Sequence, residues 1–336
     1  MADLPLPPLE LADRVGELPS GDPWHEYLGA GEVLRDDLVA ALPGDWSWEG
    51  RRVLDFGCGA GRVLRQFALI APGAELHGCD LHAPSVAWIN KRLSPPLQAF
   101  VAVEGEPLPR PDGYFDLVYG VSVFTHLDAF NWAGWLLELH RVLRPGGLLL
   151  LSYLGESQAW RLDEPWSDER IGMNALWAGG KSASATLAAR PEGPPPDEVP
   201  SPLVFHSKWW IRAHWGRAFE ILALDPDALR FGPGRAPGQA LCVMRRREVS
   251  LSAEDLERPE PGEHRELTAA LHHARQLYRE AAEQRRLAED LQAQLLRAAE
   301  AERRAAELYA TVTASRSWRL TLPLREAAQR LRRRRG

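Results

Sequence analysis

Short apolar runs and helical patterns alternate through the middle of the chain. Between residues 51 and 247, runs of strand length are followed by segments with apolar positions three and four apart. Strands are expected at 51–58, 74–80, 98–104, 114–122, 148–154, 219–224 and 238–247, and helices at 62–70, 83–93, 130–143 and 207–219. Continuous apolar strands are typical of a sheet that is buried on both faces. The alternation therefore predicts an α/β fold with a doubly wound, mainly parallel sheet.

The pattern changes before this region, within it and after it. A helical segment is expected in residues 1–50. Residues 155–202 lose the periodicity and include a proline-rich run, which predicts an insertion or lid. Residues 248–262 are expected to be a linker.

A long helical pattern follows the linker. Residues 263–313 contain no proline or glycine, and their apolar positions recur at spacings of three and four. This predicts a long helix that forms a coiled coil and an oligomer, with a single solvent-exposed helix as the alternative. Residues 314–336 are expected to form a basic amphipathic tail that a proline interrupts.

Composition narrows the class of protein. The chain has 336 residues, of which 45% are apolar, enough for an ordinary packed core. It shows no signal-peptide pattern and no apolar run near the ~20 residues of a membrane span, so a cytoplasmic protein is expected. The three cysteines form no C-x-x-C pair, and neither a disulfide framework nor a metal site is expected.

Charge is distributed unevenly along the chain. From Arg316 to the end there are eight arginines and one acid, a local charge of +7 on a chain of net charge −6, which leaves −13 elsewhere. An acidic main domain with only three lysines disfavours nucleic acid as a partner. The basic tail instead predicts contact with an anionic surface, expected to be the inner face of the membrane, with a disordered, solvated tail as the alternative.

The stretch VLDFGCGAG, residues 53–61, carries the clearest chemical signal. Its glycines are two apart, so it fits neither the G-x-G-x-x-G dinucleotide pattern nor the phosphate-binding P-loop. Asp55 leads into this turn. An acid beside a tight glycine turn suits a ligand that has a cationic amino group, although Asp55 could instead only cap the turn.

Four motifs in order resemble the class I S-adenosylmethionine-dependent methyltransferases: LDFGCGAG, GCD at 78–80, EGEPLPRPDGYFDLV at 104–118 and HRVLRPGGLLLLS at 140–152. The resemblance implies a Rossmann-like seven-stranded sheet with S-adenosylmethionine as the cofactor. It implies that the glycine turn holds the methionine part, Asp80 the ribose hydroxyls and the Glu104 segment the adenine. The cofactor residues implied are Asp55, Gly57, Gly59, Gly61, Asp80, Leu81, Glu104 and Gly105.

Some of these residues have simpler alternatives. Asp80 could cap the following helix, and Glu104, where the family more often has Asp, could be a surface charge. In the N-terminal segment, Tyr27 and Gly31 either close over the methionine carboxylate or belong to ordinary helix packing.

A methyl acceptor that carries a hydroxyl also needs a proton acceptor. His126 follows the fourth strand and His206 precedes the helix at 207–219, so both are candidate bases, each with a structural alternative. His140 is expected to be structural. No Asn/Asp-Pro-Pro-aromatic stretch follows the fourth strand, which again disfavours nucleic acid as the acceptor.

The tail segment SRSWRLTLPLR, residues 315–325, resembles a segment near the ends of bacterial glycosyltransferases and methyltransferases of surface-polysaccharide assembly. The resemblance implies O-methylation of a sugar hydroxyl on a surface glycan or its lipid-linked precursor, with a glycosyltransferase as partner. Two alternatives stay open: methylation of a small natural product, and a coiled-coil scaffold with a vestigial cofactor domain.

Overall fold

The computed structural model describes residues 4–12, 22–127, 131–161, 172–177, 181–184, 203–234 and 237–333. The chain divides into two compact units, residues 1–274 and 275–336. Each unit is described by itself.

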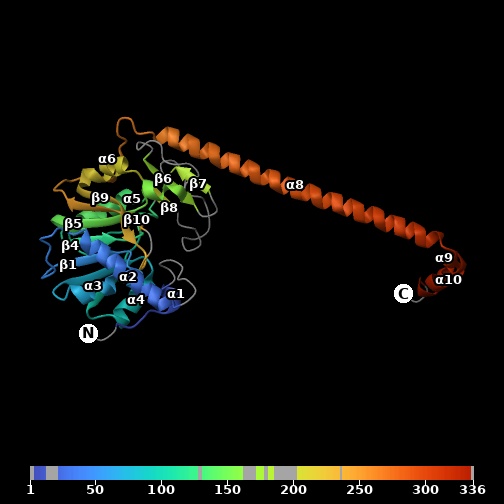
Figure 1. The fold of residues 1–336 in the computed structure, drawn as a ribbon, viewed down its shortest axis with the longest axis horizontal. Helices are drawn as coiled ribbons and strands as arrows, with labels where there is room; N and C mark the ends of the chain where they lie inside the picture. The colour runs from blue at the N-terminus through green and yellow to red at the C-terminus, as the bar shows by residue number, and fades with distance from the viewer. Residues whose placement is uncertain are drawn as a thin grey trace. The chain divides into compact units, whose positions relative to one another are not determined.

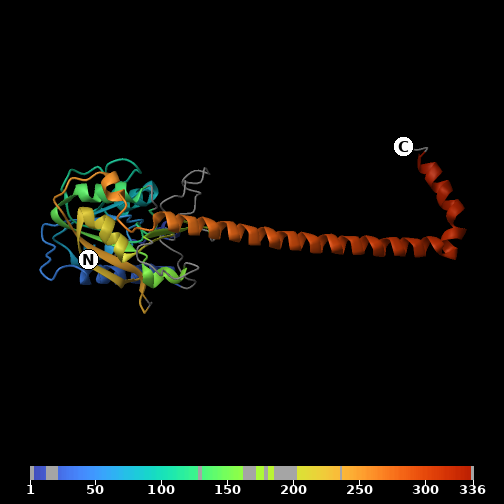
Figure 2. The same ribbon diagram turned by 90° about the horizontal axis from the view of Figure 1, so that it is seen from above.

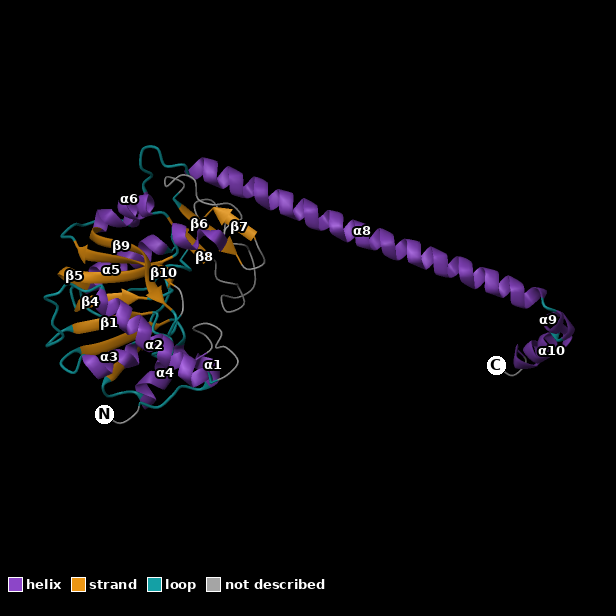
Figure 3. Ribbon diagram, viewed as in Figure 1, coloured by secondary structure: helices purple, strands orange, loops and turns teal. Residues whose placement is uncertain are grey.

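A seven-stranded sheet forms the centre of the first unit (Figure 3). Its strands lie in the order β3-β2-β1-β4-β5-β10-β9. Their bounds are β1 Arg52–Phe56, β2 Glu75–Asp80, β3 Leu97–Val101, β4 Phe115–Gly120, β5 Leu143–Tyr153, β9 Phe219–Arg230 and β10 Pro237–Arg246. The first five strands are parallel, and β10 pairs antiparallel with both β5 and β9. The predicted doubly wound sheet is confirmed, and its strand order reverses between β1 and β4, where ligands bind in folds of this kind.

Helices cover both faces of the sheet (Figures 1 and 2). One apolar cluster includes residues of α2 (Pro23–Ala40), α3 (Leu64–Ile70) and α4 (Ala83–Arg92). The other includes residues of α5 (Trp132–Val142), α6 (Lys208–Ala218) and α7 (Ala253–Glu257). The structure also describes α1 (Leu9–Ala12) and a 3-10 helix at Glu156–Arg161 in this unit. The helices predicted at 62–70, 83–93, 130–143 and 207–219 therefore form close to their expected positions.

The expected insertion at 155–202 contains strands in its described part. β6 (Met173–Trp177) pairs with β7 (Lys181–Ser184) and with β8 (Leu203–His206), and the three form a small antiparallel sheet. The proline-rich run within 191–202 lies outside the described residues.

The segment expected to be a linker is held against the domain. Within it, α7 begins at a capping box in which Ser252 and Asp255 bond each other's backbone N–H groups. Leu256 is fully buried, and its carbonyl accepts a hydrogen bond from His214 Nδ1 at 2.7 Å. His214 Nε2 lies 3.1 Å from a Glu263 carboxylate oxygen, with both side chains at most 1% exposed. The segment is thus part of the domain's core and not a free tether, because the buried His214 of α6 contacts both Leu256 and Glu263.

The second unit is helical. The helix α8 spans Arg265–Ala314, α9 spans Arg316–Leu320 and α10 spans Leu322–Arg333 (Figure 1). The predicted long helix forms, while the coiled coil and the oligomer stay predictions. The tail breaks at Thr321 and not at its proline, because Pro323 lies in the first turn of α10, where proline is tolerated. No helix in the described part of the chain is long and apolar enough to cross a membrane.

Candidate functional site

The glycine turn after β1 is built from three residues with left-handed backbone. Gly57, Gly59 and Gly61 have φ values of 81°, 51° and 83°. The N–H groups of Gly57 and Cys58 both donate to the Cys79 carbonyl, at 2.8 and 2.9 Å, and so fix the turn to the end of β2. A Cβ atom on Gly57 would lie 2.3 Å from a Val123 methyl carbon. This position needs glycine both for its conformation and for the close approach of the loop after β4.

Asp80 at the end of β2 joins this turn to the start of α4. One carboxylate oxygen accepts from the Gly59 N–H at 2.7 Å, and the other accepts from the His82 N–H at 2.8 Å. His82, and not Asp80, is the N-cap residue of α4. Each carboxylate oxygen can accept a further hydrogen bond, so Asp80 can organise the loop and still bind hydroxyl groups of a ligand.

Asp55 presents a buried carboxylate at the same edge of the sheet. The residue is only 3% exposed, and its Oδ2 atom has no hydrogen bond of full geometry among the described residues, although the Tyr119 hydroxyl lies close to the carboxylate. Burial raises the pKa of Asp55 to about 7, and the negative charge of Asp80 acts in the same direction, while the nearby Tyr119 hydroxyl and the positive charge of Arg62 oppose this rise. An unpaired buried carboxylate oxygen is costly, and a cationic donor from a ligand would satisfy it.

Tyr119 is a neighbour of Asp55 that the sequence analysis missed. The two residues are register partners on the parallel strands β1 and β4. The Tyr119 hydroxyl is buried and has no hydrogen-bond partner within the described ranges. Burial and the charge of Asp55 raise the pKa of Tyr119 well above its usual value. The signal that finds Tyr119 is the β1–β4 register, which a single sequence does not supply.

The helix α2 lies against the glycine turn from the N-terminal side. Tyr27 is fully buried, and its hydroxyl donates to the Ala60 carbonyl at 3.3 Å. A Cβ atom on Gly31 would lie 2.3 Å from the Arg62 carbonyl oxygen, so α2 approaches the turn as closely as backbone allows. The structure thus brings Tyr27 and Gly31 to the glycine turn, where ordinary packing accounts for both, and their contact with a carboxylate stays a prediction.

Arg62, which the sequence analysis did not select, adds a positive charge at this turn. The residue is half-buried, and its Nε atom is buried without a hydrogen-bond partner in the described chain. Burial lowers the pKa of Arg62, and the nearby Tyr27 and Asp55 side chains oppose that effect. One side of the turn therefore holds an unpaired acidic atom and an unpaired basic atom. An amino acid group carries the complementary pair of charges, so the residues present fit the methionine part of the implied cofactor.

The remaining predicted cofactor residues lie along the next part of the edge. Leu81, which follows the end of β2, is 60% exposed. The Ala102 N–H donates to the Asp80 carbonyl at 3.0 Å, which places the segment after β3 next to Asp80. Glu104 and Gly105 lie on that segment, and the exposed Glu104 carboxylate accepts a weak hydrogen bond of 3.4 Å from Asn131. The contact of Glu104 with adenine stays a prediction.

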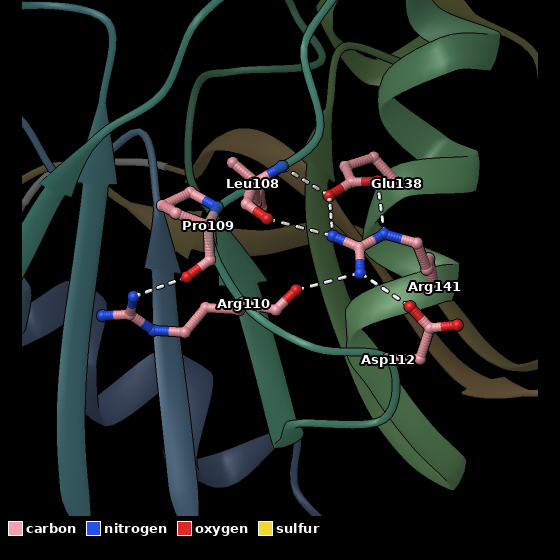
Figure 4. A network of polar contacts seen from close by, with 6 residues as sticks. All are labelled: Leu108, Pro109, Arg110, Asp112, Glu138 and Arg141. Atoms are coloured by element: carbon pink, nitrogen blue, oxygen red, sulfur yellow. Dashed lines mark hydrogen bonds and ion pairs between the residues drawn. The ribbon is translucent and has the colours of Figure 1, made fainter.

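A polar network anchors the chain that follows Glu104 and Gly105 (Figure 4). Glu138 of α5 accepts from the Leu108 N–H at 2.7 Å and from Arg141. Arg141 also donates to the carbonyls of Leu108 and Arg110, at 3.1 and 2.9 Å, and to Asp112 at 2.7 Å. The carboxylates of Glu138 and Asp112 raise the pKa of Arg141. This network positions the predicted adenine segment against α5.

The two candidate bases lie in different surroundings. His126 is half-buried in the loop after β4, and its backbone N–H donates to the carbonyl of Val123, the residue that faces Gly57. His206 is fully buried, with ring centroids of Trp210 and Trp215 at 5.2 and 5.3 Å. Burial and the nearby His214 lower the pKa of His206 to about 3. A base with so low a pKa has little tendency to take a hydroxyl proton, so the structure disfavours His206 and leaves His126 as a prediction.

Several tryptophans lie in or beside the expected insertion at 155–202, and the face of a tryptophan ring can stack on a flat ligand. Trp210 is 1% exposed, and its ring stacks on His214 at a centroid distance of 4.5 Å. Trp210 is therefore a core residue, as is His140, whose Nε2 bonds the Arg247 carbonyl at 2.9 Å. Trp166 lies outside the described residues.

Comparison with known proteins gives matches over the same region. Residues 54–151 match the family model described as a methyltransferase domain. A malonyl-[acyl-carrier protein] O-methyltransferase of Enterobacter lignolyticus is 33% identical over 42% of this chain and 56% of the relative. A fatty-acid O-methyltransferase of Mycolicibacterium smegmatis is 35% identical over 30% of this chain and 36% of the relative. A ubiquinone/menaquinone biosynthesis C-methyltransferase of Pseudomonas paraeruginosa is 35% identical over 44% of this chain and 60% of the relative.

The chain spans about half the length of the curated relatives it matches. Among solved structures, the PH0226 protein from Pyrococcus horikoshii aligns with a TM-score of 0.43 at 14% identity, over 68% of this chain and 93% of that chain.

Proposed function

Starting from a class I methyltransferase domain whose cofactor is S-adenosylmethionine, we propose that this protein transfers the cofactor's methyl group to an oxygen acceptor. The observation that carries the proposal is the pair of unpaired atoms at the glycine turn, Asp55 Oδ2 and Arg62 Nε. The methionine part of the cofactor has an ammonium group and a carboxylate. Asp55 would bind the first and Arg62 the second, so each buried charge would gain a partner.

Other residues would hold the rest of the cofactor. Asp80 would accept hydrogen bonds from the ribose hydroxyls while it keeps the Gly59 and His82 N–H groups. Leu81 would cover its exposed apolar surface against the adenine ring. Glu104 and Gly105 would line the far side of that ring, on the segment that Glu138 and Arg141 hold in place. When bound, the cofactor supplies an electrophilic methyl group on a sulfonium sulfur.

The protein's own contribution to the transfer is alignment and proton removal. The loop after β4 packs on Gly57 through Val123, and it carries His126. His126 would accept the proton of a hydroxyl acceptor as the new oxygen–carbon bond forms. An acceptor that is already a carboxylate would need no base.

Two acceptor classes follow from different observations. The basic tail and its resemblance to surface-polysaccharide enzymes favour a sugar hydroxyl on a glycan or its lipid-linked precursor. The names of two relatives favour a carboxylate on an acyl chain, since one acts on malonyl-[acyl-carrier protein] and one on a fatty acid. We propose the glycan hydroxyl first and the acyl carboxylate second. A glycosyltransferase partner belongs to the first proposal.

Cofactor binding is tested first, by calorimetric titration with S-adenosylhomocysteine. Asp80→Ala should abolish measurable binding while the far-UV circular dichroism stays unchanged. The matched control is Asp45→Ala, which removes an exposed carboxylate outside the site and should leave binding intact. Wild-type protein that gives no heat would favour the scaffold alternative, and an unchanged affinity in Asp80→Ala would refute the site.

The acceptor is tested with radiolabelled S-adenosylmethionine and separated fractions of the source cells. Label in polysaccharide or lipid-linked glycan supports the first acceptor class, and label in acyl chains supports the second. Label only in small molecules supports the natural-product alternative. Label in nucleic acid would contradict the proposal. In a fraction that takes up label, His126→Ala should lower the turnover number if the acceptor is a hydroxyl, and should leave it nearly unchanged if the acceptor is a carboxylate.

A further inference from the structure

The last two helices expose apolar side chains that no described residue of their own unit covers. We call α9 and α10 the C-terminal helix pair. Leu320, Leu322 and Leu324 are 79%, 47% and 73% exposed. They stand close together in the chain, on both sides of the break at Thr321. Water-exposed leucines at this density are unusual unless another apolar phase receives them.

The helix pair has a defined corner between its two helices. Ser315 caps α9 by accepting from the Trp318 N–H at 3.3 Å, and the Thr321 N–H closes the turn on the Ser317 carbonyl at 3.1 Å. The Arg325 guanidinium of α10 lies 3.3 Å from the centroid of the Trp318 ring and also donates to the Trp318 carbonyl. The corner therefore has a defined local geometry, with Leu320 on α9 and Leu322 and Leu324 in the first turn of α10.

The positive charge of the helix pair indicates which kind of partner can bind these leucines. The sequence from Arg316 onward has eight arginines and one acid, Glu326. Arg316 and Arg319 are exposed in the first of the two helices. A partner must therefore offer negative charge beside an apolar layer, which is the composition of an anionic lipid surface.

Nucleic acid meets only one of these two requirements. Its phosphates would pair with the arginines, but the three exposed leucines would stay in water. Base stacking needs an open aromatic face, and Arg325 already lies over the Trp318 ring.

We propose that the C-terminal helix pair binds the surface of an anionic lipid bilayer. Leu320, Leu322 and Leu324 enter the headgroup region, and Arg316 and Arg319 pair with lipid phosphates. Each arginine that reaches such a surface should strengthen binding about fivefold. Each leucine that leaves water should contribute about tenfold. The proposal does not depend on methyl transfer and is tested without it.

The test is co-sedimentation of the full chain with lipid vesicles. One vesicle preparation is phosphatidylcholine alone and the other contains phosphatidylglycerol as well. Wild-type protein should sediment with the anionic vesicles at low salt and be released when the salt is raised, because salt screens the arginine contacts. Equal binding to both preparations would overturn the proposal.

Two tail variants separate the apolar and charged contributions. The double variant Leu320→Ser/Leu324→Ser should bind about a hundredfold more weakly. Arg316→Gln/Arg319→Gln should bind about 25-fold more weakly and show a smaller salt dependence. The second variant leaves the leucines in place, so it keeps the test decisive if the first one disturbs the corner.

The matched control is Leu9→Ser/Leu69→Ser in the first unit, whose leucines are 46% and 48% exposed. This control should bind vesicles like the wild type, and a loss equal to that of the tail variants would overturn the assignment to the helix pair. Binding to an RNA homopolymer that the tail arginine variant abolishes, with no binding to vesicles, would replace the lipid surface by nucleic acid. All variants should bind S-adenosylhomocysteine alike, so failure here is distinct from failure of the proposed function.

Discussion

Replacing Asp55 by asparagine should make the cofactor-free protein more stable. Burial and Asp80 raise the pKa of Asp55 to about 7 from 3.8. Because the folded-state pKa is the higher one, this group's contribution to stability is fully present below pH ~4 and is lost as pH rises through 7. At pH 8 the wild-type chain holds an ionised carboxylate in a site that disfavours it. Each pH unit between the two pKa values corresponds to ~1.4 kcal/mol, so Asp55→Asn should gain up to about 4 kcal/mol at pH 8 and almost nothing at pH 4.

The same substitution should weaken cofactor binding. A hydrogen bond from the ligand's ammonium group to a carboxylate contributes about 1.5–3 kcal/mol, which is roughly a 10- to 150-fold loss of affinity in the variant. In the wild type only ionised Asp55 makes this contact. With a pKa of about 7, affinity should fall about elevenfold between high pH and pH 6, whereas Asp55→Asn should lose that pH dependence.

Two measurements check the expected gain in stability and the expected loss of cofactor affinity. Thermal unfolding of the cofactor-free protein gives the stability, and calorimetry with S-adenosylhomocysteine from pH 5.5 to 8.5 gives the affinity. Asp45→Asn is the matched control, because Asp45 is exposed and outside the site. A variant that is less stable than the wild type, or that keeps wild-type affinity at pH 8, would refute the assignment of Asp55 as the ammonium partner.

Two further substitutions test the close packing at the glycine turn and the buried contact that holds the segment before α8. Gly57→Ala places a Cβ atom 2.3 Å from a side chain of the loop after β4 and in a left-handed backbone, so urea unfolding should show a loss of about 1–3 kcal/mol together with weaker S-adenosylhomocysteine binding. Gly44→Ala, where no atom lies within 4 Å of the new carbon, should change neither, and equal effects at both positions would contradict the steric argument. Glu263→Ala leaves the buried His214 Nε2 without its hydrogen-bond partner and should cost about 1–3 kcal/mol in the same unfolding assay. Glu220→Ala, from a pair whose side chains are about half exposed, should cost less than ~1 kcal/mol, and a similar loss in both variants would speak against a special role for the buried pair.

The parts of the site that sequence predicts are those set by neighbouring residues. Three glycines spaced by two after an apolar run predict the turn at Gly57, Gly59 and Gly61. All three residues have left-handed backbone in the structure. The apolar runs fixed the strands in the same way, because each run needs burial on both faces. Asp80 was found because it ends one of these runs.

The parts that sequence did not predict depend on contacts between distant segments. Tyr119 faces Asp55 only through the register of β1 against β4. His206 looked accessible beside an insertion, yet the tryptophans of α6 fold over it. The segment before α8 looked like a linker because its proline and glycine content is high, but the His214–Glu263 contact fixes its end in the core. Polar partners of this kind leave no periodic trace in the sequence.

Arginine is the only basic residue type in the C-terminal helix pair, and this limits how the charge of the pair can be controlled. Guanidinium groups stay protonated at every pH that cells reach, and they are not targets of the acetylation that neutralises lysine. Proton concentration therefore acts on the carboxyl at the glycine turn and leaves the charge of the C-terminal helix pair constant. Dissolved ions act on the helix pair and scarcely reach the buried turn. The glycine turn therefore responds to pH and the C-terminal helix pair responds to salt. A change in one of these properties of the solution affects one site and leaves the other unchanged.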